Sequence, residues 1–408
     1  MLVDIVNEKL DLIILTGTLR DGGAEVIATN LIAHFPSYIS KEIIVRQQNI
    51  SQQDSAEATS TESKYVVFRT VRNHLPKPVK NILKPFYILS DIIRYHSILR
   101  KKHPSISLSI SCADNLINVI SSLFSKTKPI LSCHYLPSQY NVCGGYIVNK
   151  LTYFIARISG AHIVAVSNSV AEDLYTHYHI SKQHIHTIYN PIDLKTIQIK
   201  SIDNISDSRI NLNVPTIITV GRLNEVKGQW HLIRVFAELQ KKYESQLLIC
   251  GEGPEKEYLS NLVTELNLGD KVVFLGWQEN PYKYMKKAVL LAHSSLSESF
   301  GNIIVEAMAC GCPSVVARCS PAIEEVMGAN NSCGIITHEM SGIRHPANSP
   351  LDATEISFLE SIQHVLNNVD LRTEMSMACL EQAKRFDVNI GIEQYVQLIN
   401  NLTFKQNC

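Results

Sequence analysis

The feature that most constrains the fold is an alternation of short apolar runs with segments of helical spacing, repeated along most of the chain. In the second half the runs predict strands at residues 216–220, 246–250, 272–275, 289–292, 314–317 and 334–336, with helices near 229–243, 255–267, 301–310 and 321–328. In the first half they predict strands at 12–15, 43–45, 66–68, 106–110, 129–133 and 163–166. Strands that alternate with helices are typical of parallel, doubly wound α/β sheets.

A polar stretch between residues 190 and 214, rich in Asn, Asp, Ser and Pro, separates the two series. The chain has 408 residues, whereas one domain commonly holds about 150. We therefore expect two sheet domains, residues 1–195 and 196–387. Residues 388–403 have helical spacing, but periodicity alone does not identify what this helix packs against. A polar run at 49–63 predicts a surface loop.

The composition excludes several classes of protein. Apolar residues make up 45% of the chain, charged residues 19%, and the formal net charge is zero, so neither extended disorder nor nucleic-acid binding is expected. The N-terminus lacks a basic segment ahead of an apolar run, and no run reaches 18 apolar residues, so we expect no secretory signal and no spanning helix. The ten cysteines include no Cys-x-x-Cys pair, which favours reduced thiols in a cytoplasmic protein.

The segment 221–228, Gly-Arg-Leu-Asn-Glu-Val-Lys-Gly, follows the expected strand at 216–220 and leads into a helix. Doubly wound folds bind ligands where a strand ends and a helix begins. Arg222 offers a guanidinium fork and Lys227 a point charge, a pair that suits a diphosphate. The alternative is an exposed turn with solvated charges, since both residue types are common on surfaces.

The segment 298–313 begins with Glu298 and carries Glu306 eight residues later. If both were helical they would lie about 12 Å apart along the axis, so we expect Glu298 in the loop before a helix and Glu306 on its second turn. The helix N-terminus between them offers N–H groups and a partial positive charge to an anion. The two carboxylates could accept hydrogen bonds from the hydroxyls of a ribose and a hexose. Alternatively, Glu306 is a charged residue on an apolar helix, where a carboxylate usually has a partner.

Two weaker signals lie in the first half. The loop 17–25 follows the first strand, and its glycine pair, Gly22 and Gly23, allows close approach of a ligand or simply a tight turn. His134 stands at the end of the strand at 129–133, where it could donate to a phosphate or a sugar hydroxyl. A lone histidine is more often structural.

Taken together, these motifs resemble the retaining glycosyltransferases of family 4. The resemblance rests on Gly-Arg-Leu with Lys-Gly in 221–228, on Glu-x7-Glu running into Ala-Met-Ala-Cys-Gly-x-Pro in 298–313, on Asn-Pro-Ile-Asp at 190–193 and on Gly-Gly-Ala-Glu at 22–25. Residues 276–285 are similar to members that build bacterial surface polysaccharides. The motifs occur in the family's order over about residues 11–330.

The resemblance implies the GT-B fold, in which two doubly wound, Rossmann-like domains face a cleft that holds the donor. Residues 1–195 would form the acceptor-side domain, 196–387 the nucleotide-sugar-binding domain, and 388–408 would cross back to the first. Arg222 and Lys227 would bind the diphosphate, Glu306 the ribose and Glu298 the donor hexose. The implied catalytic set is Glu298, His134, Arg222 and Lys227, and the implied donor-binding set is Gly22, Gly23, Arg222, Lys227, Glu298, Phe300, Gly301, Asn302, Ile303 and Glu306.

The implied reaction is the retaining transfer of a hexose or N-acetylhexosamine from a nucleoside diphosphate sugar to a saccharide acceptor. The acceptor would be lipid-linked, in the synthesis of bacterial surface polysaccharide or lipopolysaccharide. We favour uridine as the base and leave guanosine open. The resemblance also implies front-face attack, in which the departing phosphate takes the acceptor's proton. A sugar-nucleotide epimerase or a non-catalytic nucleotide-sugar-binding module of the same fold remains an alternative.

The sequence favours a mechanism that needs neither metal nor cofactor. No Asp-x-Asp occurs, the motif with which transferases of the other main fold hold a divalent cation. Arg222, Lys227 and a helix N-terminus can supply the same positive charge. The pairs His177-x-His179 and His184-x-His186 lack cysteine or carboxylate partners at zinc spacing.

The stretch 64–102 carries ten basic residues and one acid, Asp91, interleaved with apolar residues. Basic amphipathic segments favour anionic membrane surfaces. We therefore expect this stretch to dock a cytoplasmic enzyme peripherally at the inner face of the plasma membrane, beside a lipid-linked acceptor. The alternative is a solvated helix face.

Overall fold

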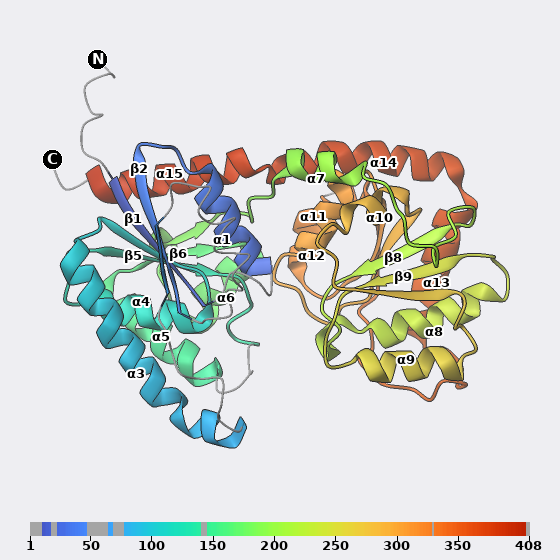
Figure 1. Ribbon diagram of the computed structural model, residues 1–408, viewed down its shortest axis with the longest axis horizontal. Helices are drawn as coiled ribbons and strands as arrows, with labels where there is room; N and C mark the ends of the chain where they lie inside the picture. Colours follow the sequence, from blue (N-terminus) through green and yellow to red (C-terminus); the bar gives the residue numbers. More distant parts are fainter. Residues whose placement is uncertain are drawn as a thin grey trace, which may run out of the picture. The chain divides into compact units, whose positions relative to one another are not determined.

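The computed structural model describes residues 10–17, 23–46, 64–67, 77–139, 145–328 and 330–404. Gly22 and the surface loop expected at 49–63 lie outside these residues. The chain divides into two compact units: unit 1 is Met1–Pro191 with Val388–Cys408, and unit 2 is Ile192–Asp387. Each unit is built on its own parallel sheet, as the two series of strands predict (Figure 1).

The sheet of unit 1 has seven strands in the order β3-β2-β1-β4-β5-β6-β7, and every pairing is parallel. Its strands are β1 (Leu10–Thr16), β2 (Ile39–Val45), β3 (Lys64–Val67), β4 (Ile106–Ser109), β5 (Lys128–Cys133), β6 (His162–Ala165) and β7 (Ile185–Thr187). The sequence did not predict β7, because three residues that include His186 and Thr187 form no apolar run.

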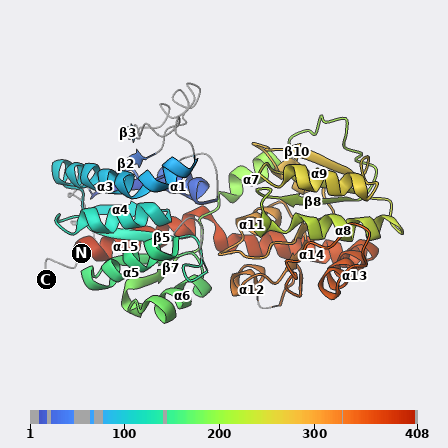
Figure 2. The same ribbon diagram turned by 90° about the horizontal axis from the view of Figure 1, so that it is seen from below.

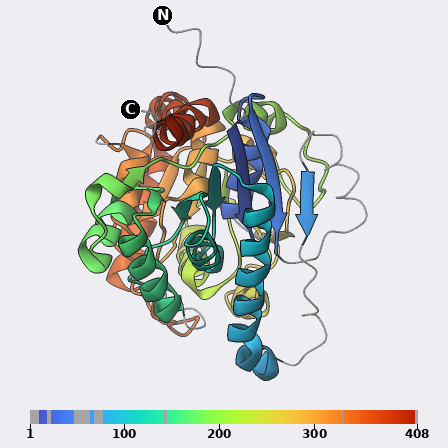
Figure 3. The ribbon, with the colours of Figure 1, turned by 90° about the vertical axis from the view of Figure 1, so that its left-hand side faces the viewer.

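The helices of unit 1 lie on both faces of this sheet. They are α1 (Gly23–His34), α3 (Lys77–Lys102), α4 (Cys112–Ser122), α5 (Gly145–Ser159), α6 (Asn168–Tyr178) and α15 (Val388–Phe404). Helix α4 packs between α3 and α5 in one layer (Figure 2). Helix α15 packs against α1, across the strands from α3 (Figures 1 and 3).

Helix α15 returns the end of the chain to the first unit, which confirms the crossing back expected of the last helix. Its Tyr395 lies edge-on to Phe35 with ring centroids 6.2 Å apart, and the Tyr395 hydroxyl lies 3.3 Å from Ser132 Oγ. Lys128 Nζ donates to the carbonyl oxygen of Leu402 over 2.6 Å. These contacts join α15 to β5, whose carboxyl end carries His134.

The sheet of unit 2 has six parallel strands in the order β10-β9-β8-β11-β12-β13. They are β8 (Thr216–Val220), β9 (Gln246–Cys250), β10 (Val272–Gly276), β11 (Leu290–His293), β12 (Ser314–Ala317) and β13 (Gly334–Thr337). The helices are α7 (Leu194–Ser201), α8 (Gln229–Gln240), α9 (Lys256–Glu265), α10 (Tyr282–Lys287), α11 (Asn302–Ala309), α12 (Pro321–Met327), α13 (Ala353–Asn367) and α14 (Val369–Ala383). The strand order reverses between β8 and β11, so the segments that follow these two strands flank the switch point.

Glycines set the path of the chain after β8 and β9. A Cβ at Gly251 would lie 1.9 Å from the carbonyl oxygen of Gly221, and a Cβ at Gly253 would lie 2.2 Å from that of Leu223. The backbone amide of Leu223 donates to the carbonyl oxygen of Glu252 over 2.9 Å. Only glycine allows so close an approach, so these residues fix the segment 221–228 against the end of β9.

Within the described part of the chain, every helix is too short or too polar to cross a lipid bilayer.

Candidate active site

Two segments from the sequence analysis meet at the carboxyl edge of the sheet in unit 2. The segment 221–228 follows β8, and the segment that leads to Glu298 follows the neighbouring strand β11. The backbone amide of Leu296 donates to the carbonyl oxygen of Val226 over 2.8 Å. Gly228, with φ +57°, lies so close that its Cβ would be 2.4 Å from the Ser294 carbonyl oxygen. The loops therefore form one surface, although about 70 residues separate them.

Three polar groups converge on one oxygen of Glu298. Lys227 Nζ forms an ion pair with Glu298 Oε1, and Ser295 Oγ donates to the same atom over 3.1 Å. Nε2 of the buried His293, the last residue of β11, lies 3.0 Å from it. No described residue donates to Oε2. The carboxylate is thus fixed through one oxygen, and the other can accept a hydrogen bond from a ligand.

Glu298 is ionised at neutral pH. Burial alone raises the pKa of this carboxyl, but the charge of Lys227 and the hydrogen bond from His293 outweigh burial and hold the pKa well below its ordinary range. An ionised carboxylate only accepts hydrogen bonds. Glu298 is therefore suited to sugar hydroxyls and unsuited to act as a proton donor.

Glu306 differs from Glu298 in having no partner among the described residues. It lies on the second turn of α11, half-buried, and no described residue forms a hydrogen bond or an ion pair with its carboxylate. Burial raises its pKa to about 7. Tyr282, the first residue of α10, lies close by: burial and then the charge of Glu306 raise the pKa of its hydroxyl well above the ordinary value. A half-buried carboxylate to which no described residue is bonded is a candidate ligand-binding group.

The beginning of α11 lies between the two glutamates along the chain. Gly301 caps the helix with φ +94°, and Asn302 and Ile303 form its first turn. Phe300 is buried, with its ring edge-on to Phe386 at 5.5 Å, so only its backbone can serve a ligand. The helix N-terminus provides N–H groups and partial positive charge at this edge.

Arg222 completes the positive charge of this edge. It is the second residue after β8, its side chain is exposed, and it forms no ion pair with a described residue. Lys227 bends over Gly221, whose Cβ position lies 3.6 Å from Lys227 Cε. One cation is therefore held on Glu298, while the other is available to an anion.

The remaining predicted residues belong to unit 1. His134 follows β5 directly, and its Nε2 lies 2.9 Å from Ser132 Oγ. Burial lowers the pKa of His134 to about 4, against a hydrogen bond with Asn190 that raises it, so the imidazole is neutral at physiological pH. Gly23 is exposed and begins α1, and Gly22 lies outside the described residues.

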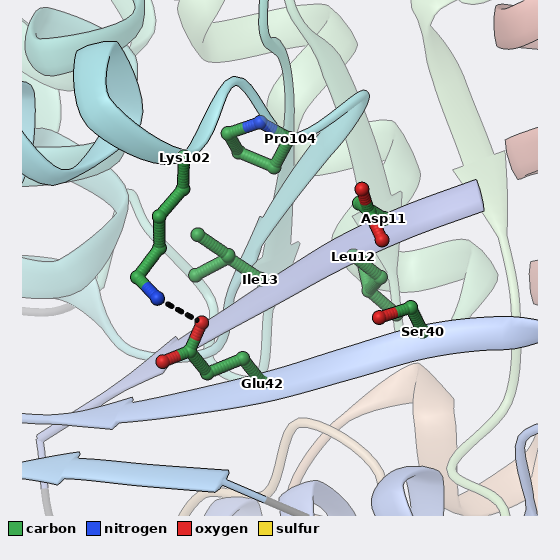
Figure 4. Close-up of a pocket in the computed structure, with 7 residues that line it drawn as sticks. All are labelled: Asp11, Leu12, Ile13, Ser40, Glu42, Lys102 and Pro104. Atoms are coloured by element: carbon green, nitrogen blue, oxygen red, sulfur yellow. Dashed lines mark ion pairs between the residues drawn. The ribbon is translucent and has the colours of Figure 1, made fainter. Parts of the chain in front are cut away.

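A shallow pocket in unit 1 lies away from these residues. Its lining comprises Asp11, Leu12, Ile13, Ser40, Glu42, Lys102 and Pro104 (Figure 4). Lys102 Nζ and Glu42 Oε2 form an ion pair across it at 2.8 Å. The residues come from the first halves of β1 and β2 and the end of α3, the amino edge of the sheet. Doubly wound folds bind ligands at the carboxyl edge, so we do not assign this pocket to the site.

Comparison with known families agrees with this geometry. The family model described as Glycosyltransferase Family 4 matches residues 21–196, and the model described as Glycosyl transferases group 1 matches residues 201–341. The chain belongs to glycosyltransferase family 4. The match identifies the protein as a transferase. It disfavours the two alternatives left open by the sequence, a sugar-nucleotide epimerase and a non-catalytic binding module.

Relatives of this family 4 glycosyltransferase include named enzymes. It is 27% identical over 378 residues, 91% of this chain and 94% of the other, to N-acetylgalactosamine-N,N'-diacetylbacillosaminyl-diphospho-undecaprenol 4-alpha-N-acetylgalactosaminyltransferase of Campylobacter jejuni. It is 26% identical to the lipopolysaccharide core biosynthesis glycosyltransferase LpsD of Rhizobium meliloti, over 47% of this chain and 52% of the other.

Solved structures show the same fold. Anabaena Alr3699/HepE in complex with UDP and glucose superposes with a TM-score of 0.74 at 17% identity, over 96% of this chain and 99% of that one. WaaG, a glycosyltransferase involved in lipopolysaccharide biosynthesis, superposes with a TM-score of 0.66 at 13% identity, over 96% of this chain and 99% of that one. The family 4 glycosyltransferase therefore has the GT-B fold.

Three side chains of this edge were absent from the sequence-based prediction. His293 and Ser295 contact Glu298, and Tyr282 lies near Glu306. A signal for His293 existed, because it ends the apolar run 289–292 with a titratable residue at the carboxyl end of a buried strand. No such signal marked Tyr282, since an aromatic residue at the start of a helix is ordinary.

Proposed function

We propose that this transferase moves a hexose or N-acetylhexosamine, with retention of configuration, from a uridine diphosphate sugar to a lipid-linked saccharide acceptor. The process would be the synthesis of a bacterial surface polysaccharide or lipopolysaccharide. Guanosine remains the second choice of base. The observation that carries the proposal is the arrangement at the carboxyl edge of unit 2, where Glu298 is fixed through one oxygen. Among the described residues, Glu306 has no hydrogen-bond or ion-pair partner and Arg222 has no ion-pair partner.

Each group has a distinct task in this proposal. Arg222, Lys227 and the N-terminus of α11 stabilise the negative charge that builds up on the departing diphosphate, an electrostatic contribution to catalysis. Glu306 accepts hydrogen bonds from the ribose hydroxyls, and the open oxygen of Glu298 accepts them from the donor hexose. The backbone of residues 300–303 faces the sugar and the phosphates.

The positive charge of Arg222 and Lys227 supports transfer without a divalent cation, because it can take the role that a metal plays on a diphosphate. Three protein side chains contact one oxygen of Glu298, so it suits hydroxyl binding better than covalent attack. This supports front-face attack, in which the departing phosphate takes the acceptor's proton. His134, which is neutral, is proposed as a hydrogen-bonding group for the sugar, and Gly22 and Gly23 as backbone contacts of the donor.

The names of relatives support the choice of donor and acceptor. HepE binds UDP with glucose, and the Campylobacter jejuni relative is named for a diphospho-undecaprenol acceptor. A lipid-linked acceptor also gives a role to the basic stretch 64–102. In α3 the side chains of Arg94, Arg100 and Lys101 are exposed, as docking at an anionic surface requires.

A thermal-shift panel of nucleotide sugars and free nucleotides, with chelator present, tests the donor site. A ligand that binds only the folded protein raises the unfolding midpoint by mass action. We expect a shift with one uridine diphosphate sugar, unaffected by chelator and lost in Lys227→Ala and Glu306→Gln. A shift that requires a divalent cation, or one that survives both substitutions, would contradict the proposal.

A further inference from the structure

The solvent-facing side of α5 in unit 1 is apolar where a surface helix ordinarily carries polar residues. Four large side chains are exposed there: Ile147 by 72%, Leu151 by 45%, Phe154 by 52% and Ile158 by 65%. Their spacing of three and four residues places them within an arc of about 60° at 3.6 residues per turn. They form one continuous stripe along the helix.

The four side chains of this stripe do not belong to the hydrophobic core of unit 1. The opposite side of α5 is already buried, through Asn149, Thr152, Tyr153 and Ala156, and Asn149 Nδ2 donates to the carbonyl oxygen of Pro137 over 3.1 Å. The helix cannot rotate to bury the stripe without exposing these groups. An apolar stripe held outward in this way indicates a binding surface.

Positive charge flanks the stripe. Lys150 and Arg157 are exposed on one side of it, with Lys150 Nζ 4.4 Å from the ring centre of Tyr146 and the Arg157 guanidinium 5.6 Å from that of Phe154. Helix α5 carries no acidic residue. We call the stripe together with Lys150 and Arg157 the α5 face.

A second helix of the same layer repeats the pattern. In α3, Phe86, Leu89 and Ile93 are exposed by 67%, 56% and 63%, and the only acid of this helix, Asp91, is fully buried. Helix α4 lies between α3 and α5 (Figure 2). The outer layer of unit 1 therefore presents apolar groups and cations on two helices, and exposed acids on neither.

We propose that the α5 face docks on an anionic lipid bilayer, with its apolar stripe in the headgroup region and Lys150 and Arg157 against lipid phosphates. An exposed apolar stripe with cations beside it, on a helix that carries no acid, is the pattern of an interfacial helix. A second copy of the chain is a poorer occupant, because two such faces would bring like charges together. The inference rests on the proposed lipid-linked acceptor and deepens it. It adds a surface outside the stretch 64–102 and names the side chains that enter the membrane.

Vesicle sedimentation of the full chain tests the proposal, with vesicles of phosphatidylcholine alone or with 30% phosphatidylglycerol. The wild type should bind the anionic vesicles and lose affinity as salt rises. Each cation at an anionic surface contributes about fivefold in affinity, so Lys150→Ser with Arg157→Ser should weaken binding about 25-fold. Ile147→Ser with Phe154→Ser should weaken it roughly tenfold or more, since binding scales with buried apolar area.

A matched control comes from unit 2, where Ile199 and Ile202 are exposed by 58% and 77%. Ile199→Ser with Ile202→Ser should leave vesicle binding unchanged. The thermal shift with nucleotide sugar should be the same in all these variants, which separates a failure of the docking surface from a failure of the donor site. Equal binding to neutral and anionic vesicles, equal loss in the control, or a dimer in light scattering that the α5 substitutions abolish would overturn the proposal.

Discussion

Replacing Glu306 with glutamine should stabilise the protein at high pH while it weakens donor binding. In the unfolded chain this carboxyl ionises near its ordinary pKa of 4.5, and in the folded protein burial raises the pKa to about 7. Between these values the folded state keeps a proton that the unfolded state has lost. Stability therefore falls as pH rises through this window and stays lowered above it.

The size of the effect follows from the two pKa values. Each pKa unit corresponds to about 1.4 kcal/mol, so the carboxylate costs less than about 1 kcal/mol of folding free energy at pH 5 and about 3 kcal/mol at pH 8. Glutamine does not titrate, so Glu306→Gln should gain about 2–3 kcal/mol relative to the wild type between pH 5 and pH 8. For a domain of this size that is about 5–10 °C in the unfolding midpoint.

Thermal unfolding of both proteins at pH 5 and pH 8 measures this gain. The exposed Glu324 supplies a control, because Glu324→Gln changes the same charge without burial. The same midpoint difference between Glu306→Gln and the wild type at both pH values would contradict the raised pKa of Glu306, since Glu306 would then have a partner that keeps it ionised.

Three further predictions concern His293, Gly253 and His134. His293→Leu removes one of the three polar groups that contact Glu298, at 3.0 Å. Because a polar contact with a charged group is worth about 1.5–3 kcal/mol, kcat/KM should fall about tenfold or more. His293→Gln should recover part of it, and equal activity of the two variants would show that only packing matters. Gly253→Ala should lower the unfolding midpoint by the equivalent of about 2 kcal/mol or more, because its Cβ would lie 2.2 Å from the Leu223 carbonyl oxygen; an unchanged midpoint would contradict the close approach. His134, with a pKa of about 4, should contribute no inflection to the pH profile of kcat/KM between pH 6 and pH 7.5, so an inflection in that range that disappears in His134→Gln would contradict its neutral state.

The fold could be predicted from the sequence because strands of a parallel sheet are buried on both faces and appear as short apolar runs. The same signal failed for β7 (Ile185–Thr187), where histidine and threonine interrupt any apolar run. The return of α15 to unit 1 came from the family resemblance, because its helical spacing names no partner.

The candidate site could be predicted in part. That the segment 221–228 binds a ligand at the end of its strand followed from the rule for doubly wound folds, whereas its grouping with Glu298 in one site came from the family resemblance, because the sequence does not reveal that β8 and β11 are neighbours. The convergence of His293, Ser295 and Lys227 on one oxygen of Glu298 could not, since it depends on strand register and side-chain direction. A carboxylate in apolar surroundings is expected to have a partner, but Glu306 has none among the described residues. This difference supports the hypothesis that Glu306 binds the donor. The catalytic and donor-binding roles themselves stay predictions.

The most direct test of the account is transfer of label from a radioactive uridine diphosphate sugar to a diphospho-undecaprenol-linked saccharide, with chelator present. We expect label to enter the organic phase with the wild type. Lys227→Ala and Glu298→Gln, still folded by their unfolding midpoints, should lose most of this transfer. The anomeric configuration of the product should match that of the donor. Transfer that stops with chelator, an inverted product, or undiminished transfer by both variants would contradict it.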